Sequence, residues 1–163
     1  MQKFLLTLFI AIVFVLQVCF VSGLKFMGIQ GELLLILCLF WAYRRGTEEG
    51  MLMGLLCGFL VDISSSGLFI HSISYPLTCF FVGAVRESLL GGGTLMVMSI
   101  SFFGTITSHL IELLLLYFYK KSWGALGPAI FISAMMNALL TFVILPFYKQ
   151  AVKDPDTGRL SYY

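Results

Sequence analysis

The sequence predicts an all-α integral membrane protein with six transmembrane helices, and its composition is the first reason. Apolar residues make up 60% of the 163 residues and charged residues only 11%, whereas soluble domains contain about 45–50% and about 25%. The second reason is that apolar stretches close to the length of a bilayer span, about 20 residues, follow one another along the chain. The connecting loops are short, so a soluble catalytic domain has no room between the spans.

The six spans can be justified in chain order. The first is longer than the apolar core of a signal peptide, about 7–15 residues, so we expect a retained helix. The firm part of the second is Leu33–Tyr43, and the second and third are short enough to form a hairpin that only partly crosses the membrane. The spans give a transmembrane domain over residues 1–148 and a short cytoplasmic tail over 149–163. Individually they cover residues 4–22, 27–43, 50–63, 67–85, 94–119 and 123–148.

Basic residues predict the orientation, because Lys and Arg accumulate in the short cytoplasmic loops of membrane proteins. With six spans and a cytoplasmic N-terminus, seven of the ten Lys and Arg residues fall on the cytoplasmic side. Both termini are therefore expected in the cytoplasm. Arg44, Arg45 and Arg86 are expected to be cytoplasmic anchors at the interface, with contact to anionic lipid or a cytoplasmic partner as the minor alternative.

Three glycines in the third span lie on one face of the predicted helix. Gly50, Gly54 and Gly58 are four residues apart and form two overlapping GxxxG units. In lipid, small residues allow the backbones of two helices to approach closely. The face is expected to pack against another helix, which can belong either to the same chain or to a partner.

Four ionisable residues are expected in the outer half of the membrane: Asp62, His71, His109 and Glu112. Ionisable groups inside a membrane usually face the bundle interior, a cavity or each other. They predict an outward-facing polar pocket. The alternatives are local: Asp62 satisfied by nearby serines and backbone amides, and His109 paired with Glu112, three residues away on the same helix face. One such pair offers too few ligands for a metal, and the four cysteines lack metal spacing, so no metal or cofactor is expected.

Several segments in order resemble the MreD family, the membrane subunit of the bacterial rod-shape system. LLLILCLFWAY is followed by basic and polar residues, then by the glycine-spaced helix GLLCGFLVD, a serine/glycine turn and a further apolar helix. The resemblance covers nearly the whole chain and is most specific over 41–77. The sequence departs from the family pattern at the start of the second helix, with Gln30-Gly31-Glu32, and at Leu68-Phe69, where a Leu-Gly pair is common.

The resemblance implies a non-enzymatic subunit of the bacterial inner membrane. Such a subunit pairs with MreC, a bitopic protein with a coiled coil and an extracytoplasmic β domain. Together they support the peptidoglycan polymerase and transpeptidase pair and are linked to MreB filaments inside the cell. The implied fold is similar to the six-helix substrate-binding subunits of energy-coupling-factor transporters.

Two functions of different classes remain after these observations. The favoured one is a scaffold that binds the membrane helix of MreC, with a second copy of the chain and membrane lipid as further candidate partners. The alternative is a small-molecule-binding or transport subunit that uses the outward polar pocket. An intramembrane enzyme is disfavoured, because the chain lacks Gly-x-Ser-x-Gly and His-Glu-x-x-His motifs. No nucleic-acid partner is expected.

Overall fold

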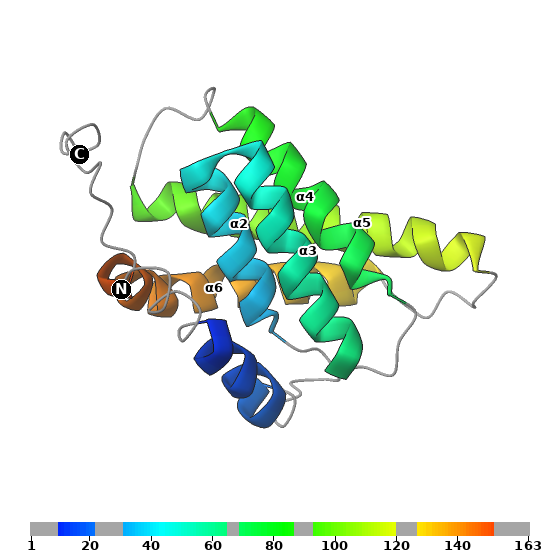
Figure 1. The fold of residues 1–163 in the computed structure, drawn as a ribbon, viewed down its shortest axis with the longest axis horizontal. Helices are drawn as coiled ribbons and strands as arrows, with labels where there is room; N and C mark the ends of the chain where they lie inside the picture. Colours follow the sequence, from blue (N-terminus) through cyan, green and yellow to red (C-terminus); the bar gives the residue numbers. More distant parts are fainter. Residues whose placement is uncertain (1–9, 22–30, 65–68, 87–92, 120–126, 152–163) are drawn as a thin grey trace.

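The computed structural model describes residues 10–21, 31–64, 69–86, 93–119 and 127–151, and every regular element in these ranges is helical (Figure 1). The first helix covers residues 10–21 and ends in a π-helical turn, η1 (Gln17–Val21). The six described helices confirm the predicted all-helical architecture. The other five are α2 (Leu33–Arg45), α3 (Thr47–Ser64), α4 (His71–Val85), α5 (Thr94–Phe118) and α6 (Gly127–Ala151).

Two of these helices are long and apolar enough to cross a membrane, Thr94–Phe118 and Ala129–Phe147. At about 1.5 Å per residue, each of the 25-residue helices α5 and α6 is about 37 Å long, against a hydrocarbon core of about 30 Å. The 13 residues of α2 reach only about 20 Å. The separate crossing of the four shorter described helices therefore remains a prediction.

The helix bounds differ from the predicted spans mainly around the turn between α2 and α3. Gly46 has a φ of 97°, in a region that favours glycine, and it alone separates the two helices. As a result α3 begins at Thr47, three residues before the predicted span, with Glu48 and Glu49 in its first turn. Acidic residues suit this position because helix N-termini carry partial positive charge. At the other end of the chain α6 continues to Ala151, and residues 152–163 of the predicted tail lie outside the described ranges.

Helix α2 is the central helix of the bundle. Every residue from Leu33 to Phe40 is buried, and α2 packs against α3, α4, α5 and α6. Its sequence begins LLLILCLF, which is apolar on all sides. A helix that is hydrophobic all round is stable only when neighbours cover all of its faces.

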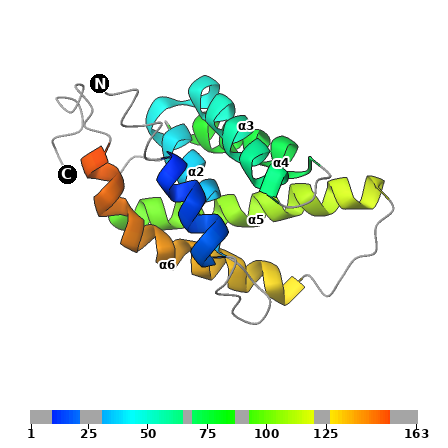
Figure 2. The same cartoon turned by 60° about the horizontal axis from the view of Figure 1, so that its bottom comes forward.

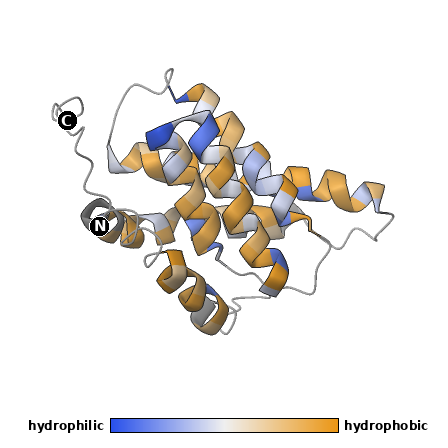
Figure 3. Cartoon of the chain, in the orientation of Figure 1, coloured by the Kyte–Doolittle hydropathy of each residue, from blue (hydrophilic) through white to orange (hydrophobic). Residues whose placement is uncertain are grey.

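The remaining helices form two groups around α2. Helices α3 and α4 pack most extensively against each other and also contact α2, while α5 and α6 form a second pair that crosses behind them (Figures 1 and 2). The C-terminal part of α5 extends past α4 in both views. The surface is dominated by large apolar side chains, and hydrophilic ribbon is concentrated at a few places that include the α2–α3 turn (Figure 3). Such a surface is typical of a protein surrounded by lipid.

The connection before α4 contains an unusual backbone conformation. Phe69 has a φ of 49°, in the left-handed region that a side chain disfavours and glycine adopts freely. This is the position where the MreD-like pattern commonly has glycine. The Phe69 ring stacks on Phe59 of α3, with 6.3 Å between the ring centroids. The aromatic contact therefore offsets part of the conformational cost.

Candidate functional site

Asp62, at the end of α3, caps the first turn of the neighbouring helix α4. It is 3% exposed, and its carboxylate accepts hydrogen bonds from the backbone amides of His71 at 3.2 Å and Ser72 at 2.7 Å. The Ser72 hydroxyl donates to it at 2.6 Å, and His71 Nδ1 lies 2.8 Å away. A carboxylate is well placed here, because the first amides of a helix lack intrahelical partners and carry partial positive charge. Asp62 thereby holds the C-terminal end of α3 against the N-terminal end of α4.

A second cluster is centred on Glu112 of α5. One oxygen of its carboxylate lies 3.0 Å from His109 Nδ1. The other oxygen accepts hydrogen bonds from the hydroxyl of Ser108 at 3.0 Å and from that of Ser74, on α4, at 3.2 Å. His109 Nε2 in turn lies 3.1 Å from the Ser133 hydroxyl of α6. The His109–Glu112 pair therefore connects α5 to α4 and to α6.

Glu32, immediately before α2, joins this second cluster, and sequence reasoning missed it. Its carboxylate accepts a hydrogen bond from the Tyr75 hydroxyl at 3.4 Å and lies 3.8 Å from His109 Nε2. Its backbone amide donates to Asn137 Oδ1 at 2.8 Å. The available signal was a lone carboxylate inside the apolar stretch predicted as the second span, which is a functional candidate by default.

A polar ladder between α5 and α6 was also missed. Asn137 Nδ2 donates to the Thr105 hydroxyl at 3.0 Å, and the Thr141 hydroxyl donates to Ser101 Oγ at 2.8 Å. All four of these residues are at most 2% exposed. A single asparagine in an apolar helix was the visible signal. Hydrogen bonds across membrane helices contribute about 0.6–2 kcal/mol each, so the ladder holds α6 on α5.

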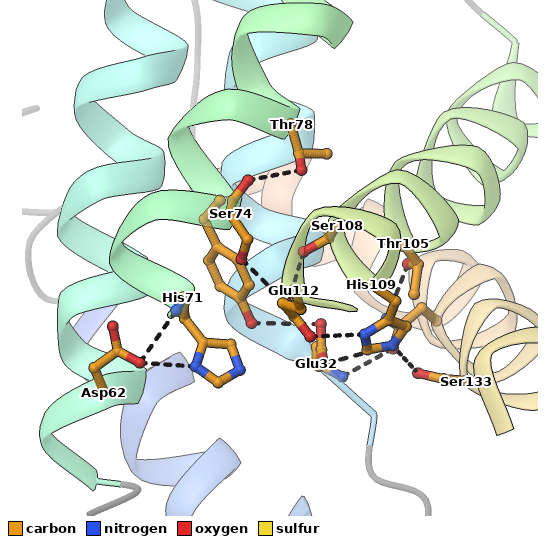
Figure 4. A network of polar contacts seen from close by, with 12 residues as sticks. Glu32, Asp62, His71, Ser74, Thr78, Thr105, Ser108, His109, Glu112 and Ser133 are labelled. Atoms are coloured by element: carbon orange, nitrogen blue, oxygen red, sulfur yellow. Dashed lines mark hydrogen bonds and ion pairs between the residues drawn. The ribbon is translucent and has the colours of Figure 1, made fainter. Parts of the chain in front are cut away.

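The four residues predicted to share one pocket form two hydrogen-bonded pairs, which Tyr75 links: its ring lies edge-on to His71, 5.5 Å between centroids, and its hydroxyl bonds Glu32 of the second cluster. Within the described ranges, no hydrogen bond or ion pair joins the Asp62–His71 pair to the His109–Glu112 pair. In the view of Figure 4, His71 lies between Asp62 and the second cluster. The side chains of His71, His109 and Glu112 keep 25%, 17% and 14% exposure. This partial exposure leaves an edge of the polar region accessible.

The chemistry of the second cluster is that of a hydrogen-bonded ion network. Two carboxylates, Glu32 and Glu112, flank one imidazole, so each charged group has an opposite or hydrogen-bonding partner. Pairing of this kind is what allows ionisable groups to lie inside a membrane. In the described part of the chain, no three His, Cys, Asp or Glu side chains are arranged to hold a metal ion. The arrangement is suited to fixing helix positions and to receiving a polar group at its exposed edge.

The glycine face of α3 is covered by helices of the same chain. A Cβ built on Gly50 meets the side chain of Ala42 in α2, and one on Gly54 lies 2.9 Å from backbone atoms of Pro76 in α4. On Gly58 it meets the carbonyl oxygen of His71. Of the two kinds of neighbour that the sequence allowed, the structure places helices of the same chain on this face. A partner helix cannot reach it without displacing α2 or α4.

The three arginines predicted as anchors lie together at one end of the bundle. The guanidinium groups of Arg44 and Arg45 lie over the rings of Phe40 and Trp41, 5.8 Å and 5.3 Å from the ring centroids. Arg86, which follows α4, donates from Nη1 to the carbonyl oxygen of Arg44 at 3.3 Å. Cations near the last carbonyls of a helix are favourable because that end carries partial negative charge.

Comparison with protein families identifies the chain over nearly its whole length. Residues 1–151 match the family model described as rod shape-determining protein MreD. The matched range contains all six described helices and every residue of the two polar clusters. No curated protein and no solved structure matches the chain.

Proposed function

The chain belongs to the MreD family of rod shape-determining proteins, and on that premise we propose that it is a non-enzymatic scaffold of the cell-elongation machinery. The family is a structural membrane protein family, so a role in determining rod shape follows from membership. The scaffold holds a partner in the membrane and performs no reaction of its own. Its internal polar groups stabilise the bundle.

The proposed partner is MreC, bound through its membrane helix. Through this contact the chain supports the peptidoglycan polymerase and transpeptidase pair and is linked indirectly to MreB. In this proposal the six spans of residues 1–148 lie in the inner membrane, with both termini in the cytoplasm and the three arginines at the cytoplasmic interface. A second copy of the chain is the further candidate partner.

The observation that carries the scaffold proposal is the exposed apolar face of the α5–α6 pair. Only 28% of the spanning stretch of each helix is buried inside the chain. On α6, large exposed side chains recur at helical spacing, with Phe131, Met135, Leu139 and Phe142 each at least 49% exposed. The glycine face and the polar clusters are already used within the chain. The α5–α6 pair therefore offers an exposed apolar surface on which a membrane helix can pack.

Co-purification from native membranes tests this proposal. A tagged wild-type chain is expected to bring down MreC, identified by mass. The double variant Leu139→Ala/Phe142→Ala is expected to lower MreC recovery about tenfold, since losing two large contacts removes at least about 1.4 kcal/mol of binding. The matched control is Leu52→Ala/Leu55→Ala on the exposed face of α3, which should keep wild-type recovery.

The outcomes separate the parts of the proposal. Equal loss in both double variants would place the contact elsewhere than α6. Absence of MreC from the wild-type sample, with the chain folded, would refute the scaffold itself. Thermal unfolding of each variant in detergent checks that the fold is retained.

The second candidate is a small-molecule-binding or transport subunit, and one observation favours it. The polar clusters keep an accessible edge, with 25% exposure at His71 and 15% at Glu32. This candidate function goes together with the proposal that the fold is similar to that of the substrate-binding subunits of energy-coupling-factor transporters. Native mass spectrometry of the purified chain tests it: a bound small molecule lost on Glu32→Gln would support it, and a chain of unmodified mass would count against it.

A further inference from the structure

The polar ladder between α5 and α6 has three rungs that repeat every four residues along both helices. From one rung to the next, the position on α5 rises by four and the position on α6 falls by four. Residues four apart share one face of a helix, so all three rungs lie along a single seam between the two helices. The paired side chains are Ser101 and Thr141 at 2.8 Å, Thr105 and Asn137 at 3.0 Å, and His109 and Ser133 at 3.1 Å.

A ladder with this period does not define its own register. If α6 slides by four residues toward the C-terminal end of α5, Thr141 comes to lie opposite Thr105. Asn137 then lies opposite His109, so two polar rungs form again. A slide in the opposite direction brings Asn137 opposite Ser101, whose hydroxyl already lies 3.5 Å from the Asn137 carbonyl oxygen. The ladder by itself therefore distinguishes these registers by only one rung.

The other contacts of the two helices resist such a slide only weakly. The hydroxyls of Thr105 and Thr141 also lie 2.7 Å from the carbonyl oxygens four residues before them, so they keep a partner on their own helix. Only 28% of the spanning stretch of α6 is buried inside the chain, and Leu145 and Ile144 contribute apolar contacts to the core. Apolar contact is non-directional, so it fixes an axial position less sharply than a hydrogen bond does.

One contact of the ladder does not repeat. Asn137 has two polar side-chain atoms: Nδ2 donates to the Thr105 hydroxyl, and Oδ1 accepts a hydrogen bond from the backbone amide of Glu32 at 2.8 Å. The other two ladder residues of α6 have a single hydroxyl oxygen each. Glu32 is in turn held by α4, because its carboxylate accepts a hydrogen bond from the Tyr75 hydroxyl at 3.4 Å. A slide of four residues moves Asn137 by about 6 Å along the helix axis and breaks its bond to Glu32.

We propose that the hydrogen bond between the Glu32 amide and Asn137 determines the register of the α5–α6 pair. The ladder permits axial positions of α6 that are one turn apart, and this bond selects one of them. Without it, α6 also occupies a neighbouring register. The exposed apolar face of α6 moves with the helix, so the register sets where that face lies on the bundle. The bond lies within the chain, and the proposal is independent of MreC binding.

Distances between spin labels on the full chain in lipid nanodiscs test the register, with the labels carried by unnatural amino acids. Two label pairs join opposite ends of the helices, Leu95 with Phe131 and Leu114 with Phe142, and all four positions are at least 55% exposed. A slide of α6 by one turn toward the C-terminal end of α5 lengthens the first distance by about 5 Å and shortens the second by about 5 Å. A slide the other way reverses both signs. Wild type is expected to show a single distance for each pair.

Three variants separate the Glu32 bond from the ladder. Asn137→Thr keeps a hydroxyl opposite Thr105 but removes the oxygen that binds Glu32, so the ratio of shifted to native molecules should rise at least about fivefold. The matched control is Thr141→Val, at a position that is 1% exposed in the same seam. It removes a whole rung but keeps the bond to Glu32, so it should keep the wild-type distances.

The third variant sets the direction of the slide. Ser133→Asn/Asn137→Ser moves the asparagine one turn earlier on α6, so its bond to Glu32 can form only after α6 slides toward the N-terminal end of α5. A second population is expected in which the Leu95–Phe131 distance is shorter and the Leu114–Phe142 distance is longer. Thermal unfolding checks that each variant is folded, and Asn137→Ser replaces Asn137→Thr if the latter fails to fold.

Three results would overturn the proposal. The first is wild-type distances in both asparagine variants. The second is a shift in Thr141→Val as large as that in Asn137→Thr, which would show that the rungs alone hold the register. The third is a lengthening of both distances together, which would show that the helices separate and do not slide.

Discussion

Replacing Gly58 with alanine should separate the ends of α3 and α4. A Cβ built on Gly58 meets the carbonyl oxygen of His71, and its next neighbours are His71 C at 2.6 Å and Ser72 N at 2.9 Å. All three are backbone atoms of the first turn of α4, so no side-chain rotation can make room. The turn that must move is the one that Asp62 holds with its hydrogen bonds.

The magnitude can be worked from these contacts. Alanine favours a helix interior over glycine by about 0.5–1 kcal/mol. Overpacking costs about 1–3 kcal/mol, and loss of one hydrogen bond to the Asp62 carboxylate costs about 1.5–3 kcal/mol. The net destabilisation expected for Gly58→Ala is about 1.5–5.5 kcal/mol. At about 2–4 °C per kcal/mol for a chain of this size, the unfolding temperature should fall by about 3–22 °C.

Gly104→Ala provides a matched control for thermal unfolding in detergent. Its built Cβ lies 2.6 Å from Leu39 Cδ1, which is the end of a flexible side chain and can shift. The control involves a side-chain rather than a backbone contact, and the helix preference for alanine offsets part of the packing cost, so a smaller destabilisation than that of Gly58→Ala is expected. The reasoning is refuted if Gly58→Ala unfolds at or above the wild-type temperature, or if the two variants are equally destabilised.

Three further predictions follow from single residues. Asp62→Asn removes the charge that caps α4, so hydrogen exchange at the amide of Ser72 should become at least about tenfold faster, while unchanged exchange would contradict the cap. Glu112→Leu removes the carboxylate that lies beside His109 Nδ1 and accepts from the Ser74 and Ser108 hydroxyls, while His109 keeps Glu32 and Ser133 as partners; it should cost about 1–3 kcal/mol in a denaturation assay, with Glu112→Gln losing less than half of that, and equal losses would show that shape matters more than hydrogen bonding. Phe69→Gly removes about 1–3 kcal/mol of backbone strain and an aromatic contact of about 0.5–1.5 kcal/mol, so its unfolding temperature should be at least that of wild type, and a marked decrease would show that the stacking dominates.

The helices could be predicted from the sequence because their causes are local. The apolar run of α2 and the long apolar stretches of α5 and α6 each set an element without knowledge of its neighbours, whereas the one-residue turn at Gly46 was not predicted. The role of α2 as the central helix was not predicted. Its shortness suggested a partial crossing, whereas its burial depends on four other helices that surround it.

The contacts of the candidate site also fall into two groups, those that the sequence indicates and those that it does not. The contact between His109 and Glu112 lies within one helix, so their three-residue spacing indicates it. The contact between Asp62 and His71 crosses only one short connection. Glu32 reaches the cluster across 43 residues to Tyr75 and 77 residues to His109. No pattern within α2 indicates either partner.

The sequence by itself therefore determined a helical membrane protein and the polar residues that need partners, and the order of its segments indicated the family by resemblance. The membrane character and the polar residues follow from composition and periodicity, because transfer of each residue into lipid has a cost that does not depend on the fold. Only the tertiary structure decided which partners they find. The glycine face of α3 is closed by α2 and α4, and the carboxylates meet groups of α4 and α5 that are distant in sequence. Helix packing in lipid is set by close contacts between surfaces, and the sequence alone does not show which surfaces pair.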